Sequence, residues 1–223
     1  QRQMCIRDSI DTLSYDEIQI NRKFYLSGKK ELELLKRIRL SASDSYVRVK
    51  NGFATLFDDV FIGELPFMEY TIPVLKASTG KWSRAFFPYD EKGSPLTYEL
   101  LSECESVCRY LEDHAERLLK GRKRSETPDW FLYGRTQALK DVCILKYAVN
   151  TCIKGVGSIK LTEVPPGCGL YSGLYILPDK GVTFDMLDRI IRNEEFIRYV
   201  SLLKNYKSGG YYTFNSKDLE LYI

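Results

Sequence analysis

The sequence has a single histidine, His114, and no apolar run that approaches the ~20 residues required by a membrane-spanning helix. With one histidine, a serine or cysteine nucleophile has no obvious base, and His114 stands among Glu and Asp in a helical segment, where a solvated position is the simpler interpretation. Neither a GxxxxGK(S/T) phosphate loop nor a GxGxxG turn after a strand is present. These absences predict a cytoplasmic protein that binds rather than reacts and makes no contact with a membrane.

The cysteines and the paired acids do not form a metal-binding pattern. Cys104 and Cys108 are spaced to share a helix face, but no second close pair of cysteines completes a zinc site. Buried free thiols in a reducing cytoplasm are therefore expected. The pairs Asp58-Asp59 and Glu194-Glu195 suit exposed helix positions better than a metal or hydrolase site. The sequence predicts no metal and no cofactor within these residues.

The composition is that of a folded chain with nearly balanced charge. Of the 223 residues 44% are hydrophobic, enough for a core in one domain or in a domain with an appendage. Lys and Arg number 33 against 30 Asp and Glu, which gives a formal charge of +3. This balance is compatible with a polyanionic partner. Phosphate binding, however, depends on where the cations cluster and not on their total number.

The order of helical and strand patterns predicts an α+β fold, with mixed small sheets and interspersed helices, because the two patterns alternate without a regular βαβ repeat. Helices are expected to end near Leu40, to span 95–120 with Gly121 as the stop, and to span 183–206 with Thr183 as N-cap. Ser41–Ser45 reads as a polar break. The basic run Lys120–Arg124 reads as a solvated helix end.

The expected strands are short. A strand, a turn at Asn51-Gly52, a brief helical turn and a second strand ending at Gly63 are predicted in that order. A hairpin is predicted around 78–80, and residues 170–178 read as one buried strand. At the end of the chain, a turn at 208–210 is expected to lead into a last strand, with residues 218–223 trailing toward the edge of the domain.

Three clusters combine cations with aromatic or amide side chains, which are the groups that contact phosphates, stack on bases or hydrogen-bond to base edges. Packing and solubility are the alternative explanation for each cluster. The candidate contacts are Lys76, Lys81, Trp82 and Arg84 at the hairpin; Tyr133, Arg135 and Gln137 in WFLYGRTQ; and Lys207, Tyr211, Tyr212 and Lys217 in the final segment.

Five blocks carry a resemblance to a known family. They occur in the order VKNGFATLFDDVFI, KASTGKWSRAFFPYD, WFLYGRTQAL, LYSGLYILP and SGGYYTFNSKDLE. Together they resemble the C-terminal specificity region of N6-adenine DNA methyltransferases from restriction-modification systems, the group with the TaqI-like specificity domain. The resemblance runs from about Tyr46 to the end of the chain.

In such enzymes an N-terminal Rossmann-like domain binds S-adenosylmethionine and carries an Asn/Asp-Pro-Pro-Tyr/Phe motif that holds a flipped adenine, while the C-terminal region clamps the duplex and reads the target. The only Pro-Pro here, Pro165-Pro166, follows Val164 and precedes Gly167, so that motif is absent. The resemblance therefore implies sequence-specific binding of double-stranded DNA by a fragment that is inert alone. S-adenosylmethionine would bind the missing catalytic domain.

The resemblance also implies a division of the chain. Residues 1–9, QRQMCIRDS, are expected to be a non-native, adapter-like start, because they have neither a secretory core nor a periodic pattern. Residues 10–45 are expected to form a helical connector to the missing N-terminal catalytic domain, and residues 46–223 the target-recognition domain. The junction would lie between Asn51 and Asp59. Gly134 and Gly173 are expected at points of close backbone packing.

Two further hypotheses stay open. The specificity region of a fused restriction endonuclease-methyltransferase is the first, and its nuclease residues would lie upstream of Ile10. A non-DNA interaction domain on the same scaffold is the second. Upstream coding sequence separates the fused enzyme from a methyltransferase alone, and mutation of Arg135 and Lys81 tests the non-DNA interaction domain.

Overall fold

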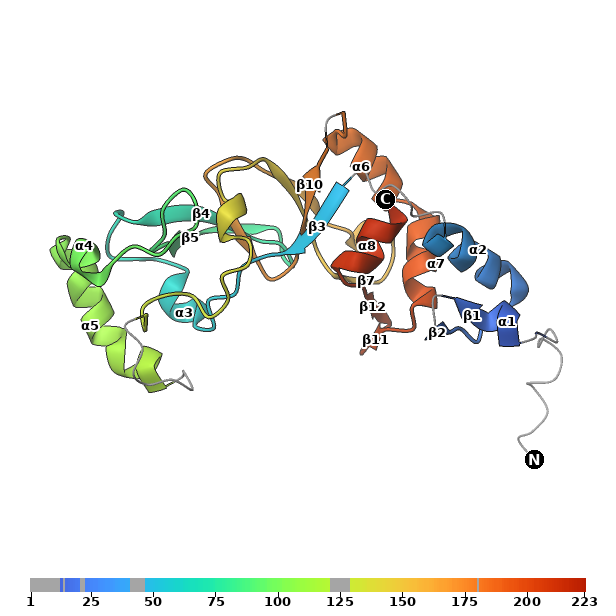
Figure 1. Cartoon of the computed structure of the whole chain (residues 1–223), viewed down its shortest axis with the longest axis horizontal. Helices are drawn as coiled ribbons and strands as arrows, with labels where there is room; N and C mark the ends of the chain where they lie inside the picture. The colour runs from blue at the N-terminus through green and yellow to red at the C-terminus, as the bar shows by residue number, and fades with distance from the viewer. Residues whose placement is uncertain (1–12, 14, 21–22, 41–46, 121–128, 180) are drawn as a thin grey trace. The chain divides into compact units, whose positions relative to one another are not determined.

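The computed structural model describes residues 13, 15–20, 23–40, 47–120, 129–179 and 181–223, which form an α+β fold of small sheets with helices between them (Figure 1). The chain divides into two compact units. The first unit comprises residues 1–48, 152–159 and 179–223, and the second comprises 49–151 and 160–178. The predicted start at 1–9, the break at Ser41–Ser45, Gly121 and most of Lys120–Arg124 lie outside the described residues.

The second unit is built on two sheets and a helical pair. Strand β3 enters it from the first unit, and the other elements follow in chain order. These elements are β3 (Val47–Asn51), α3 (Asp58–Phe61), β4 (Thr71–Lys76), β5 (Lys81–Phe86), α4 (Tyr98–Ser102), α5 (Glu105–Lys120), the 3-10 turn η1 (Leu139–Asp141), β6 (Lys146–Val149), β8 (Leu161–Val164), β9 (Gly169–Tyr171) and β10 (Leu174–Pro178).

One sheet of this unit has the strand order β3-β10-β6-β8 and the other has the order β5-β4-β9. The predicted hairpin at 78–80 is confirmed: β4 and β5 pair antiparallel from Thr71–Phe86 to Lys76–Lys81. Strand β9 pairs with β4 in parallel. Aromatic rings fill the core against the β5-β4-β9 sheet. The rings of Phe61 and Phe86 are stacked, with 6.2 Å between their centroids.

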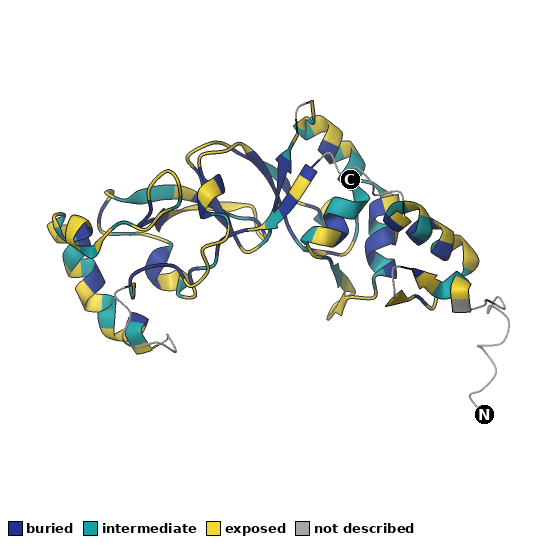
Figure 2. Ribbon diagram, viewed as in Figure 1, coloured by how far each residue is buried: buried dark blue, intermediate teal, exposed yellow. Residues whose placement is uncertain are grey.

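The first unit gathers three separated segments of the chain around a helical core. Its elements are α1 (Tyr15–Ile18), β1 (Gln19–Ile20), β2 (Lys23–Phe24), α2 (Lys29–Leu40), β7 (Cys152–Ile153), the 3-10 turn η2 (Val156–Ser158), α6 (Phe184–Ile191), α7 (Glu194–Leu202), β11 (Tyr206–Lys207), β12 (Tyr211–Thr213) and α8 (Ser216–Tyr222). Helix α2 packs against α7 and α8. Figure 2 shows both buried and exposed positions on α2, as expected for an amphipathic helix with one face in the core.

A buried ion pair fixes α8 to α2 in this unit. The Arg39 guanidinium lies 2.8 Å from the Asp218 carboxylate, and both side chains are buried. Helix α8 begins at the Asn215 cap, whose side chain accepts a hydrogen bond from the Asp218 amide. The prediction that residues 218–223 trail from the domain is therefore wrong, because they form a capped helix held by a buried charge pair.

Two helices that periodicity predicts as continuous are interrupted. Residues 95–120 form α4 and α5, with Thr97 as the N-cap of α4. Residues 183–206 form α6, capped by Thr183 as predicted, and then α7, capped by Asn193. The Asn193 side-chain oxygen accepts a hydrogen bond from the Phe196 amide, which stabilises the start of α7 after the interruption.

Three strand predictions also need correction. Residues 170–178 form two strands, β9 and β10, rather than one. The expected strand ending at Gly63 is reduced to a single bridge between Ile62 and Ala85. Gly52 does not make a turn: β3 continues to Asn51, and a Cβ on Gly52 would lie 2.6 Å from the Leu170 carbonyl oxygen. The glycine permits a close backbone approach at that point.

Candidate nucleic-acid interface

The hairpin carries exposed cations and an exposed ring. Lys81, Trp82 and Arg84 lie on β5, and Trp82 is 46% exposed. Alternate residues of a strand face opposite sides, so Trp82 shares a face with Arg84, whose guanidinium contacts the Met68 sulfur. Lys81 faces the other way. The predicted ring of cations around Trp82 is therefore divided between the two faces of the sheet.

Lysines crowd the turn of this hairpin. Lys81 lies directly opposite Lys76 across the strand pair. The Lys76 ammonium is 5.7 Å from the Tyr171 ring centroid, which partly compensates for the like charge opposite. The Lys160 ammonium donates a 2.9 Å hydrogen bond to the Thr79 carbonyl. We call Lys76, Lys81 and Lys160 the turn lysines. Their positive charges repel one another, and a bound anion would reduce that repulsion.

The second predicted cluster is mostly part of the scaffold. Tyr133 is 3% exposed, and its hydroxyl donates a 2.6 Å hydrogen bond to the Phe86 carbonyl, so the predicted DNA contact of this side chain does not fit its burial. Burial raises the Tyr133 pKa well above its usual range. Gln137 donates from Nε2 to the Gly52 carbonyl at 2.9 Å. Arg135 remains exposed, on a segment that pairs with Ala54.

The final cluster is organised by a three-stranded antiparallel sheet of order β11-β12-β7. Lys207 lies opposite Tyr211 in the β11–β12 pair. Tyr212 lies opposite Ile153 in the β12–β7 pair, and continuing this register puts Lys154 opposite Tyr211. The Lys154 ammonium is 5.9 Å from the Tyr211 ring centroid, which agrees with that placement. We call Lys207, Tyr211 and Lys154 the Lys–Tyr–Lys row.

Glycines shape the turn that brings the row together. Gly209 and Gly210 both have positive φ, 76° and 78°, between β11 and β12, which confirms the predicted turn at 208–210. All residues from Lys204 to Tyr211 are exposed, and none is acidic. In the part of the chain that the structure describes, neither lysine of the row forms an ion pair with a carboxylate. The row therefore presents two cations on either side of one ring.

The other residues predicted in this cluster lie elsewhere. Tyr212 points to the opposite face from Tyr211 and packs against Tyr206, with 5.4 Å between ring centroids. Tyr212 is therefore half-buried on the other face of the sheet and does not belong to the Lys–Tyr–Lys row. Lys217 is exposed on α8 rather than on the sheet. Sequence reasoning missed Lys154, because only strand pairing brings that distant residue beside Tyr211.

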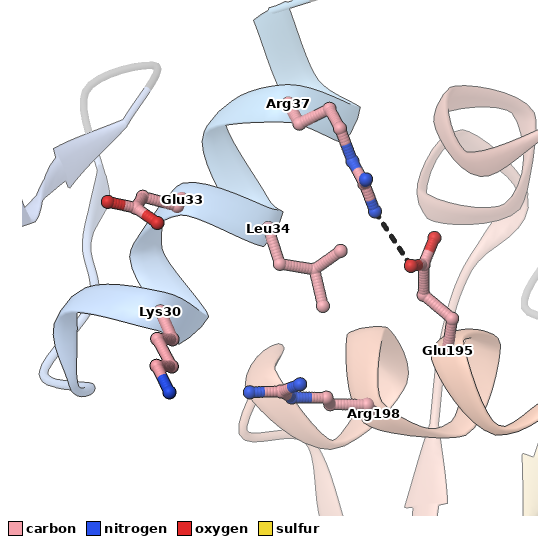
Figure 3. A pocket seen from close by; sticks show the side chains of 6 residues that line it. All are labelled: Lys30, Glu33, Leu34, Arg37, Glu195 and Arg198. Atoms are coloured by element: carbon pink, nitrogen blue, oxygen red, sulfur yellow. Dashed lines mark hydrogen bonds and ion pairs between the residues drawn. The ribbon is translucent and has the colours of Figure 1, made fainter.

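A separate crevice between α2 and α7, of about 270 Å³, is lined by one apolar, three basic and two acidic residues (Figure 3). Arg37 pairs with Glu195 at 2.7 Å, and Arg198 pairs with Glu31 at 2.7 Å. The pKa of Glu31 is lowered, and the hydrogen bond that Arg198 donates to its carboxylate makes the largest contribution. These exposed pairs link the two helices weakly, and they neutralise two of the three cations that line the crevice.

Among the described residues, no group of three or more His, Cys, Asp and Glu side chains is placed to hold a metal ion. None of the described helices combines the length and the apolar character needed to cross a bilayer. His114 lies half-buried on α5, with Nδ1 2.8 Å from the Tyr110 carbonyl oxygen, so its ring has a local structural contact.

Comparison with known proteins adds no family assignment. Neither the family models nor the curated proteins searched contain a match to this chain. The exposed cations and rings and the ordered sequence blocks are therefore the features that bear on function.

Proposed function

We propose that this chain binds double-stranded DNA as the target-recognition part of an adenine-specific (N6) DNA methyltransferase of a restriction-modification system. The Lys–Tyr–Lys row is the observation that carries the proposal. The five ordered sequence blocks supply the family. By this proposal the chain reads DNA, and methyl transfer from S-adenosylmethionine belongs to a separate catalytic domain.

The Lys–Tyr–Lys row has the positive charge and the distance between lysines that contact with neighbouring backbone phosphates needs. Neighbouring strands are ~4.8 Å apart, so Lys154 and Lys207, which lie two strands from each other, are separated by about 10 Å at the backbone. That separation lets each ammonium group contact a different phosphate. Tyr211 between them offers a hydroxyl for a phosphate or a ring for an exposed base.

The hairpin supplies a second candidate contact within the other unit. The turn lysines are close in space and repel one another in the free protein, and a phosphate would relieve that repulsion. Trp82 and Arg84, on one face of β5, are the side chains available to contact bases. We assign phosphate binding to the turn lysines and base contacts to that face.

Salt-dependent binding tests the proposal. In the double variant Lys154→Gln/Lys207→Gln, two phosphate contacts are lost, so the slope of log affinity against log salt should fall by about 1.8. The measurement is fluorescence anisotropy of a labelled duplex at several salt concentrations. The matched control is Lys29→Gln/Lys30→Gln, which removes the same charge from α2.

The two variants give opposite expectations. The control pair should retain the wild-type slope, because α2 lies outside the row. Equal slopes for both variants would show that only net charge matters and would remove the row from the interface. A wild-type chain without salt-dependent affinity for duplex DNA would overturn the proposed function.

A further inference from the structure

A cavity of about 280 Å³ opens in the first unit next to the start of β11. Its lining comes from β2, the end of α2, the segment after α7 and the start of α8. This volume is near the lower end of the ~300–1,000 Å³ of small-ligand pockets. The cavity therefore has room for a small planar group.

The floor of the cavity is polar but electrically neutral. Arg39 and Asp218 form their buried ion pair there, and the Arg39 guanidinium lies 5.6 Å from the Tyr25 ring centroid. Burial raises the pKa of Tyr25, the Arg39 charge opposes this, and the Asp218 charge adds to it. Because the Asp218 charge is already compensated, the floor does not repel an anionic ligand.

The rim differs from the floor in carrying cations and an exposed ring. Lys23 and Lys204 are exposed lysines that line the cavity, and Phe24, which also lines it, is 57% exposed. Lys204 has a φ of 60°, a left-handed conformation that is uncommon for a residue other than glycine. The next residue, Asn205, is exposed, and its backbone carbonyl accepts a 2.9 Å hydrogen bond from the Thr213 amide. The sheet thus holds this part of the rim in place.

We propose that this cavity binds one unpaired nucleotide, with the base against Phe24 and the phosphate between Lys23 and Lys204. The inference rests on the proposed function for its DNA source. Aromatic side chains stack on bases of any sequence, and lysines contact phosphates as point charges. The Asn205 amide offers both a donor and an acceptor to a base edge.

The cavity is continuous along the chain with the Lys–Tyr–Lys row. Lys204 is three residues before Lys207, so their backbones are at most about 11 Å apart. A DNA strand bound along the row would thus bring a neighbouring nucleotide within reach of the cavity. An unpaired or mismatched nucleotide costs least to turn out of the stack, which makes it the preferred occupant.

Binding of a bulged duplex tests the inference with the 223-residue chain. Wild type should bind a duplex with one unpaired adenosine about tenfold more tightly than the fully paired duplex. Phe24→Ala should abolish this preference and leave paired-duplex affinity unchanged. Lys204→Asn should reduce it, since Asn tolerates the left-handed conformation and removes only the charge. The control is Leu26→Ala, an 81% exposed apolar residue outside the cavity, which should keep the preference.

Free ligands distinguish recognition of the base from binding of the phosphate alone. Adenosine monophosphate should compete with the bulged duplex, and ribose 5-phosphate, which lacks the base, should compete much less. Equal competition by both would show that only a phosphate is bound and would overturn the inference.

The failures of the two proposals are distinguishable. If wild type binds paired duplex with the expected salt dependence but shows no preference for the bulge, the cavity proposal is overturned and the proposed function stands. If duplex binding is absent but adenosine monophosphate binds in a manner that depends on Phe24, the cavity remains a nucleotide site and the proposed function fails. Absence of both kinds of binding overturns both.

Discussion

At the scale of single residues, Asp141 is the charged group on which the second unit depends most directly. Its carboxylate accepts hydrogen bonds from Lys50 at 2.7 Å and from the Tyr175 hydroxyl at 2.6 Å. Burial alone would raise the Asp141 pKa, but the hydrogen bonds from Lys50 and Tyr175 and the charges of Lys50 and Lys146 outweigh it and lower the pKa below its usual value. The ionised form is therefore the stabilising one.

The pH dependence of stability follows from that direction. A carboxylate whose pKa is lowered by folding contributes stability above its unfolded pKa, and this contribution is lost as the pH falls through the folded value. Asp141→Asn should reduce the free energy of unfolding by about 2–3 kcal/mol at pH 6. The difference between wild type and variant should shrink below about pH 3.8. Urea unfolding from pH 6 to pH 2.5 measures it, and a difference independent of pH would contradict the role of the ionised carboxylate.

Gly173 marks a position where no side chain fits. A Cβ there would lie 2.4 Å from the Ala77 Cβ and 2.9 Å from the Val149 carbonyl oxygen, which confirms the predicted close packing. Gly173→Ala should lower the free energy of unfolding by about 1–3 kcal/mol, because backbone atoms must move. Gly157→Ala is the control, since nothing lies within 4 Å of a Cβ at that glycine. Similar melting temperatures for the two variants would refute the steric explanation.

At the scale of elements, the hairpin β4–β5 combines an unfavourable charge pair with a proposed binding role. Lys81→Glu would place opposite charges across the strands, so stability should rise by about 0.2–1 kcal/mol. By the proposed function, the same variant should bind duplex DNA less tightly. Thermal unfolding and anisotropy measure the two effects, with Lys92→Glu as a charge-matched control on an exposed loop. A loss of both stability and affinity would indicate a structural role for Lys81.

The elements show where sequence patterns suffice and where they do not. Turn residues at 78–80 and the cap at Thr183 were recognisable, because the chemistry of a turn or a cap is local. The restart of a helix at Asn193 also had a local signal, an Asn followed by two acids, but helical periodicity on both sides masked it. Lys154 was not predictable, because strand pairing across a long stretch of chain brings it into the site.

At the scale of the whole molecule, the chain passes between the two units several times. The second unit occupies 49–151 and 160–178, so one nearly contiguous stretch contains it. The first unit needs three segments, including β7, which pairs with β12. The two units should therefore respond differently to truncation.

A fragment of residues 47–178 should fold and unfold cooperatively, because it contains both sheets of the second unit and leaves 152–159 as a loop whose closure costs little. Residues 179–223 alone should remain unfolded, because α7 and α8 lose α2 and the Arg39 partner of Asp218. Circular dichroism during urea titration compares the two. A cooperative transition in 179–223, or none in 47–178, would contradict this division.

The same division determines what intrinsic fluorescence can report. The chain has two tryptophans, Trp82 and Trp130, and both belong to the second unit. An emission spectrum excited at tryptophan wavelengths therefore follows that unit only, and unfolding of the first unit passes without a tryptophan signal. The substitution Phe24→Trp would give the first unit its own optical probe, located at the cavity proposed to bind a nucleotide.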